Sequence, residues 1–246
     1  MKVSFVIGGT QKGGTSALDS FLRQHPQICM AETRKELHFF DRAEEDTDYK
    51  KYHANFRPAP RHEVVGEASP IYMYWETAPY RIWNYNPQMK WILTLRNPVE
   101  RAFSAWNMET KRGHETLSFA EAIERESERC RQALPLQHRV YSYVDRGFYA
   151  HQVRRLFNIF GRNNCLVVLS EELRNDHNRT LRRVFEFLDV ASATIPPAAN
   201  VFEQEYDQGM EKDLRKQLMN TFHFDVKELE QLLGRDLSGW YAESKR

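Results

Sequence analysis

The feature that most constrains this chain is a turn close to its start, where an apolar run gives way to glycines. Residues 3–8 read VSFVIG, a β-branched run that predicts a buried parallel strand. The following GTQKGGTSAL, residues 9–18, holds glycines, hydroxyl residues and one lysine. Apolar residues on one face then predict a helix over 16–24, which His-Pro closes. A strand, a glycine turn and a helix in this order indicate the first unit of an α/β fold.

The rest of the chain repeats the alternation of strands and helices. Further strands are predicted at 63–66, 90–95 and 165–169, and helices at 99–112, 118–129, 148–160 and 180–188, with mostly helix after residue 200. Alternating elements favour a central parallel sheet flanked by helices, with a P-loop-like first turn. We therefore predict a single α/β domain over residues 1–246, with the proline-containing segment 191–200 as the best candidate for a break.

Composition limits the possible partners. The chain has 246 residues, with 35 Lys and Arg against 34 Asp and Glu, so no nucleic-acid partner is indicated and any anion site must be local. Three widely spaced cysteines predict reduced thiols. The nine histidines show no HxxxH or HExxH spacing, so no metal site is expected. No apolar run approaches the roughly 20 residues of a membrane span, and no signal segment precedes the first strand, which predicts a cytoplasmic protein.

The composition and position of the glycine turn favour an anion-binding site. Backbone N–H groups gather at a helix N-terminus, and the helix dipole adds partial positive charge there. Lys12 supplies a formal charge, Thr15 and Ser16 supply hydroxyl donors, and Gly13 and Gly14 allow close approach to the backbone. The alternative is an ordinary glycine turn that joins a strand to a helix.

The type of anion follows from what the turn lacks. A nucleotide-hydrolysing P-loop reads GxxxxGK[ST], with the lysine directly before the hydroxyl residue. Here Gly8 and Gly13 have that offset, but Gly14 follows and the lysine precedes the glycine pair. A dinucleotide GxGxxG is also missing. A nucleotide kinase with an atypical P-loop is kept as an alternative.

The turn resembles the 5′-phosphosulfate loop of sulfotransferases that use 3′-phosphoadenosine 5′-phosphosulfate (PAPS). The likeness is greatest to the heparan sulfate branch, in which a (T/R)-K-(G/S)-G-T turn follows the first strand. Three more segments carry the resemblance: LRNPVERAFSAWN at 95–107, RKELHFFD at 34–41 and RGFYAHQVRRLF at 146–157. Together the matches run from residue 5 to about residue 170, and the pairing of KGGTS with LRNPxERxxS is the specific signal.

The resemblance implies how the PAPS nucleotide is held. Arg96, at a strand end, and Ser104, on the following helix, would bind the 3′-phosphate, since arginine offers a planar fork and serine a compact donor. Arg146, Gly147 and Tyr149 would help to hold the 3′-phosphoadenosine. The alternative for the first pair is a solvated arginine and a surface serine.

The resemblance also implies the reaction. A sulfuryl group would move by in-line displacement to an acceptor hydroxyl or amine, with Lys12 stabilising the leaving phosphate and Glu36 acting as general base. Two alternatives stay open: His38 is the base, or Glu36 merely pairs with Lys35 or Arg34 on the surface. A non-catalytic nucleotide-binding module of the same fold is a further possibility.

The sequence departs from the heparan sulfate branch after the second strand. Those enzymes carry a lysine within E-K-(T/S)-P-Y, whereas this chain reads GEASPIY and has Ala68 at that place. The cation is therefore missing or comes from elsewhere, with Arg34 and Lys35 as candidates. Glu67 and Ser69 could line the acceptor cleft or serve as a structural cap.

The acceptor itself is left open by the sequence. A carbohydrate, a lipid, a polyketide or a small alcohol all remain possible, bound by variable loops such as 41–61 and 113–140. The sequence does not indicate the oligomeric state.

Overall fold

The computed structural model describes residues 2–32, 34–42, 47–191, 195 and 209–241. The chain forms two compact units. The first comprises Met1–Arg96 and Leu156–Gln204, and the second comprises Asn97–Arg155 and Glu205–Arg246. That residues 1–246 form one domain stays a prediction.

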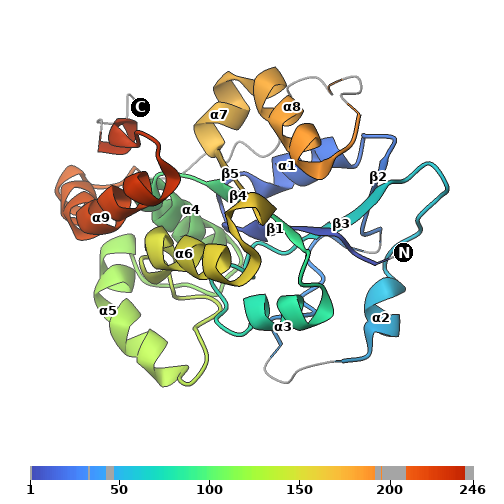
Figure 1. Ribbon diagram of the computed structural model, residues 1–246. Helices are drawn as coiled ribbons and strands as arrows, with labels where there is room; N and C mark the ends of the chain where they lie inside the picture. Colours follow the sequence, from blue (N-terminus) through green and yellow to red (C-terminus); the bar gives the residue numbers. More distant parts are fainter. Residues whose placement is uncertain (1, 33, 43–46, 192–194, 196–208, 242–246) are drawn as a thin grey trace. The chain divides into compact units, whose positions relative to one another are not determined.

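A parallel sheet organises the first unit. Its five strands lie in the order β2-β3-β1-β4-β5, and every neighbouring pair is parallel. The strands are β1 (Phe5–Gly9), β2 (Ile28–Met30), β3 (Val64–Ala68), β4 (Lys90–Leu95) and β5 (Cys165–Leu169). The sheet confirms the predicted α/β class with a central parallel sheet flanked by helices (Figure 1).

The strand order places the turn after β1 at the centre of the row that the carboxyl ends of the strands form. From β1 the chain builds β2 and β3 on one side, and then crosses to add β4 and β5 on the other. Ligands of open parallel sheets bind outside the carboxyl ends of the strands at such a reversal. The turn after β1 lies at this edge, so the topology alone favours it as a binding site.

Helices cover both faces of the sheet in the first unit. They are α1 (Thr15–Leu22), α2 (Tyr49–His53), α3 (Ala78–Tyr85), α7 (Ser170–Asn175) and α8 (His177–Leu188). Figure 1 shows α1, α7 and α8 on one face and α3 on the other. The core beneath α1 and α8 is apolar and closely packed, and its members include Phe5, Ile7, Leu18, Phe21, Ala68, Ile92, Leu181 and Phe185. This core fixes the direction in which α1 leaves the first turn.

The second unit is mostly helical. It contains α4 (Pro98–Lys111), α5 (Phe119–Gln132), α9 (Lys212–Leu233) and the first half of α6 (Tyr149–Phe160). The side chain of Asn97 caps α4 by accepting from two backbone amides, and Ser118 forms the expected cap of α5 as part of a capping box. The carboxylate of Asp225, on α9, accepts from the amide of Tyr149 at 2.7 Å and so caps α6.

Several elements were not predicted from the sequence. Strand β2 has three residues and α2 has five, too few to show a period. Helix α7 follows β5 without a break, and α8 begins at His177, three residues before the predicted start. The predicted acceptor loops contain α2 and α5. Of the predicted break at 191–200, only residues 191 and 195 are described.

None of the described helices combines the length and apolar character that crossing a bilayer requires.

Candidate active site

The turn after β1 presents backbone donors at the start of α1. Gly14 is the N-cap of α1 and has φ 103°, a left-handed conformation that favours glycine. Lys12 also lies in the left-handed region, with φ 69°. The first amides of an α-helix have no acceptor within the helix, and the helix dipole adds partial positive charge there. The turn and the N-terminus of α1 are therefore the predicted cradle for an anion, and binding there stays a prediction.

Gly13 has a role that the sequence did not reveal. A Cβ at this position would lie 2.1 Å from the backbone oxygen of Thr94, on β4. Its amide donates to the carbonyl of Thr10 at 3.0 Å. Glycine is therefore required here by the contact with β4, whereas its expected role in admitting a phosphate stays a prediction.

The segment of residues 34–41 is held by side chains that follow β3. The amide of Leu37 donates to Ser69 Oγ at 3.2 Å, and the amide of Phe39 donates to Tyr72 Oη at 3.1 Å. Arg34 donates to the carbonyl of Leu37 at 2.8 Å. The segment has no regular secondary structure, so these bonds fix its position relative to the residues that follow β3.

Glu67 is the centre of the polar cluster beneath this segment. Its carboxylate is fully buried and accepts from Tyr52 Oη at 2.6 Å, Ser69 Oγ at 2.7 Å and Tyr72 Oη at 3.2 Å. Burial raises the pKa of Glu67 to about 7, although these three donors oppose the rise. Since Ser69 and Tyr72 also accept from the 34–41 segment, Glu67 anchors that segment to β3.

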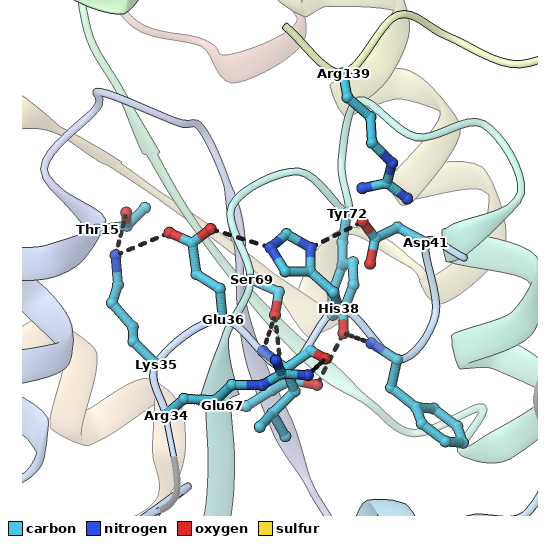
Figure 2. A network of polar contacts seen from close by, with 12 residues as sticks. Thr15, Arg34, Lys35, Glu36, His38, Asp41, Glu67, Ser69, Tyr72 and Arg139 are labelled. Atoms are coloured by element: carbon cyan, nitrogen blue, oxygen red, sulfur yellow. Dashed lines mark hydrogen bonds and ion pairs between the residues drawn. The ribbon is translucent and has the colours of Figure 1, made fainter. Parts of the chain in front are cut away.

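Four charged side chains form a row above this cluster. Figure 2 shows Lys35, Glu36, His38 and Asp41 in sequence across the view. Lys35 Nζ lies 3.6 Å from Glu36 Oε1, and Glu36 Oε2 lies 3.4 Å from His38 Nε2. His38 Nδ1 lies 2.9 Å from Oδ2 of Asp41, which is completely buried. The end of the row reaches the cradle, because Lys35 Nζ donates to Ser16 Oγ at 2.6 Å.

The contacts in this row shift the pKa values of Glu36 and His38 in opposite directions. The hydrogen bond to Asp41, together with that to Glu36, raises the pKa of His38 to about 9. Burial works against the ionised form of Glu36, but His38 and Lys35 outweigh it and its pKa lies below the ordinary value. At neutral pH Glu36 is thus a carboxylate that can accept a proton, whereas a protonated His38 has no lone pair to do so. Glu36 also pairs with Lys35, so the surface-pair alternative describes one of its contacts.

Replacing Asp41 with asparagine should lower the pKa of His38. The folded-state pKa of about 9 exceeds the ordinary 6.5, so the interaction stabilises the fold fully below pH 6.5 and is lost as the pH rises through 9. In Asp41→Asn the strongest acceptor of the imidazolium loses its charge, and the titration should move toward the ordinary value. Histidine NMR signals followed against pH would measure both proteins. An unchanged titration would contradict the assigned contact.

Two carboxylates of the site were missed or left undecided at the level of sequence. His38 and Asp41 stand three residues apart, a spacing that can bring two side chains together in a turn. That signal is weak, because the segment has no period. Glu67 could be placed only as a lining residue or a cap, since a sequence does not show which strand carboxylate is buried.

The other predicted binding residues have diverse surroundings. In the first unit, Arg96 is half-buried directly after β4. In the second, Ser104 is buried within α4 and the Tyr149 side chain is fully buried in α6. Arg146, 2% exposed, donates to Ser142 Oγ at 2.8 Å. A Cβ on Gly147 would lie 2.7 Å from the Phe222 ring. Packing against neighbouring side chains thus explains why residues 146 and 147 have these types, and the role of this segment in nucleotide binding stays a prediction.

No group of three potential metal ligands occurs among the residues that the structure describes.

The chain is similar to known proteins over most of its length. The model of the sulfotransferase domain family matches residues 3–232. The mouse heparan sulfate glucosamine 3-O-sulfotransferase 6 is 31% identical over 189 residues, which are 74% of this chain and 51% of the relative. The chain thus spans about half the length of the curated relatives of this kind that it matches.

Solved structures show the same fold. The crystal structure of a sulfotransferase from Alicyclobacillus acidocaldarius matches with a TM-score of 0.87 and 34% identity, covering 98% of this chain and 100% of the other. Mouse sulfotransferase SULT7A1 complexed with PAP has a TM-score of 0.53 and 16% identity, covering 92% of this chain and 67% of that one. The second likeness concerns the fold alone.

Proposed function

Because the chain belongs to the sulfotransferase domain family, we propose that it transfers a sulfuryl group from PAPS to an acceptor hydroxyl or amine. One observation supports the proposal: the carboxylate of Glu36 is linked to the first turn of α1. Lys35 connects the two, since its ammonium contacts Ser16 in the cradle and Glu36 in the row of charges. A donor phosphosulfate and a proton acceptor would thus lie on either side of the transferred group.

The proposed roles follow from charge. As the bond between sulfur and the bridging oxygen breaks, negative charge builds on the 5′-phosphate of the leaving adenosine 3′,5′-bisphosphate (PAP). Lys12 and the amides of Gly14, Thr15 and Ser16 would stabilise this charge. Glu36 would take the proton from the acceptor, with His38 holding the carboxylate in place.

The other nucleotide-binding residues stay as the sequence predicted them. We assign Arg96 and Ser104 to the 3′-phosphate, and Arg146, Gly147 and Tyr149 to the rest of the nucleotide. Substituting Arg96 with alanine tests the first assignment directly, because it should weaken the binding of PAP more than that of adenosine 5′-phosphate. The cytoplasmic location likewise stays a prediction.

A carbohydrate is the acceptor class to test first. The mouse relative is named a heparan sulfate glucosamine 3-O-sulfotransferase, and its match covers 74% of this chain. The structure adds a reason to include other acceptors. Ala68 is fully buried in the apolar core, so this position supplies no cation to the site. Lipid, polyketide and small-alcohol acceptors therefore belong in the same panel.

PAP should stabilise the protein against heat more than ATP or NAD does. At a hundredfold excess over Kd, a ligand that binds only the folded state adds about 2.7 kcal/mol to the free energy of unfolding. Thermal midpoints with each nucleotide, without and with Mg²⁺, would measure the effect. Stabilisation by ATP with Mg²⁺ and none by PAP would favour a nucleotide kinase and contradict the proposal.

Transfer itself needs a second measurement. Labelled PAPS should pass its sulfuryl group to at least one acceptor of the panel, with PAP released in equal amount. Binding of PAP without transfer to any acceptor would instead identify a non-catalytic module of this fold. The wild-type protein with labelled PAPS but no acceptor serves as the control for hydrolysis.

A further inference from the structure

The anchoring of the 34–41 segment does not explain the position of Lys35. The segment is already fixed through Leu37 and Phe39, whose amides donate to side chains of residues that follow β3 in the sequence. Lys35 extends the other way and reaches the first turn of α1. Its Nζ lies 2.6 Å from Ser16 Oγ and 3.5 Å from Thr15 Oγ1.

The same ammonium also touches the proposed general base. It lies 3.6 Å from Glu36 Oε1, and the Lys35 side chain is 25% exposed. An ammonium has three donors, and here two of them meet neutral hydroxyls. Besides the Glu36 carboxylate, its partners are hydroxyl oxygens, which balance a positive charge less well than an anion does. This ammonium is therefore suited to exchange a hydroxyl contact for an anionic oxygen.

Neither Ala68 nor Arg34 supplies an equivalent cation. Ala68 faces the apolar core, and Arg34 uses its guanidinium on the carbonyl of Leu37. From this geometry we infer that Lys35 is a catalytic cation of the site, whose ammonium contacts the sulfuryl oxygens while the group passes from donor to acceptor. The inference rests on the proposed function and adds a residue to it.

Atoms and electrons balance in this step. The acceptor oxygen or nitrogen attacks sulfur and forms a new bond to it, while the bond between sulfur and the bridging oxygen breaks. The bonding electron pair leaves on the 5′-phosphate of PAP, and the acceptor proton goes to Glu36. Lys35 keeps its protons throughout and contributes charge to the transferring oxygens.

Binding constants for PAPS and PAP separate this role from a structural one. PAPS carries the sulfuryl group and PAP lacks it. Lys35→Ala should therefore weaken PAPS binding by about tenfold to a hundredfold, the range for a lost charge-assisted hydrogen bond, while PAP binding changes much less. Calorimetric titration gives both constants, with single-turnover transfer as a second readout. Lys35→Arg should recover part of both, because it restores the charge.

A matched control is Lys227→Ala, which removes a lysine 50% exposed on α9 that pairs with Glu230. This variant should bind both nucleotides as the wild type does. If Lys35→Ala weakens PAPS and PAP equally, or changes neither binding nor transfer, Lys35 does not contact the sulfuryl group. Lys35→Met, which keeps the length of the side chain without its charge, allows the same comparison if the alanine variant fails to fold.

The two proposals can fail separately. A wild-type protein that transfers normally beside an unaffected Lys35→Ala overturns this inference alone. A wild type that binds neither nucleotide overturns the proposed function with it.

Discussion

Glu36→Gln should reduce the rate of sulfuryl transfer by about 10²–10⁴-fold, the usual contribution of a general base. Glutamine keeps the size and hydrogen-bonding reach of the side chain but cannot take the acceptor proton. Single-turnover kinetics with saturating PAPS would measure the loss. Binding of PAP should change little, because the cradle on α1 does not include residue 36.

The control for this variant is Glu76→Gln, which neutralises an exposed carboxylate in the same unit. It should transfer at the wild-type rate. Near-normal turnover in Glu36→Gln, together with abolished turnover in His38→Ala, would reverse the assignment and make His38 the base. That outcome would also require the pKa of His38 to fall from about 9 when the substrates bind.

Lys12→Ala should lower kcat by about 10²–10³-fold, which is the usual effect of removing one donor from the oxyanion hole of an enzyme. The charge on the leaving phosphate is greatest in the transition state, so the effect on kcat should exceed the effect on PAP binding. Presteady-state kinetics and calorimetry would give the two values. The backbone of Lys12 has φ 69°, and alanine has a similar cost there, so the thermal midpoint should stay close to that of the wild type.

Lys216→Ala is the matched variant, because it removes an exposed lysine of α9, to which no binding role is assigned. A loss of transfer in both lysine variants would indicate a general effect of charge instead of a local one. Turnover of Lys12→Ala within a few-fold of the wild type would contradict the assigned role.

The order of elements could be predicted because the strongest local patterns are the ones that build the sheet. Residues 90–95 and 165–169 are mostly apolar runs, and β4 and β5 have those bounds. Strand β2 was missed because three residues carry no period, and its place beside β3 depends on pairing between distant segments. Such pairing is a property of the folded chain and leaves no local signal.

The site could be predicted in part. The glycine turn and Glu36 indicate their chemistry by residue type, and a resemblance to a known family adds their roles. The sequence offers a pairing of Lys35 with Glu36 as one alternative, but it does not indicate that Lys35 contacts the first turn of α1. Only the fold brings Lys35 to Ser16, 19 residues away in sequence. The burial of Asp41 is likewise a tertiary property.

The contact between the first turn and β4 has a consequence for selectivity. The amide of Thr10 donates to the oxygen of Thr94 at 3.0 Å, and the missing Cβ of Gly13 leaves room for that same oxygen. Arg96 follows two residues later along the same chain. The proposed cradle and the start of the proposed 3′-phosphate site both contact or follow β4, so this strand fixes the distance between them. The fixed distance would favour nucleotides whose two phosphates have the same separation over nucleotides that carry only one phosphate.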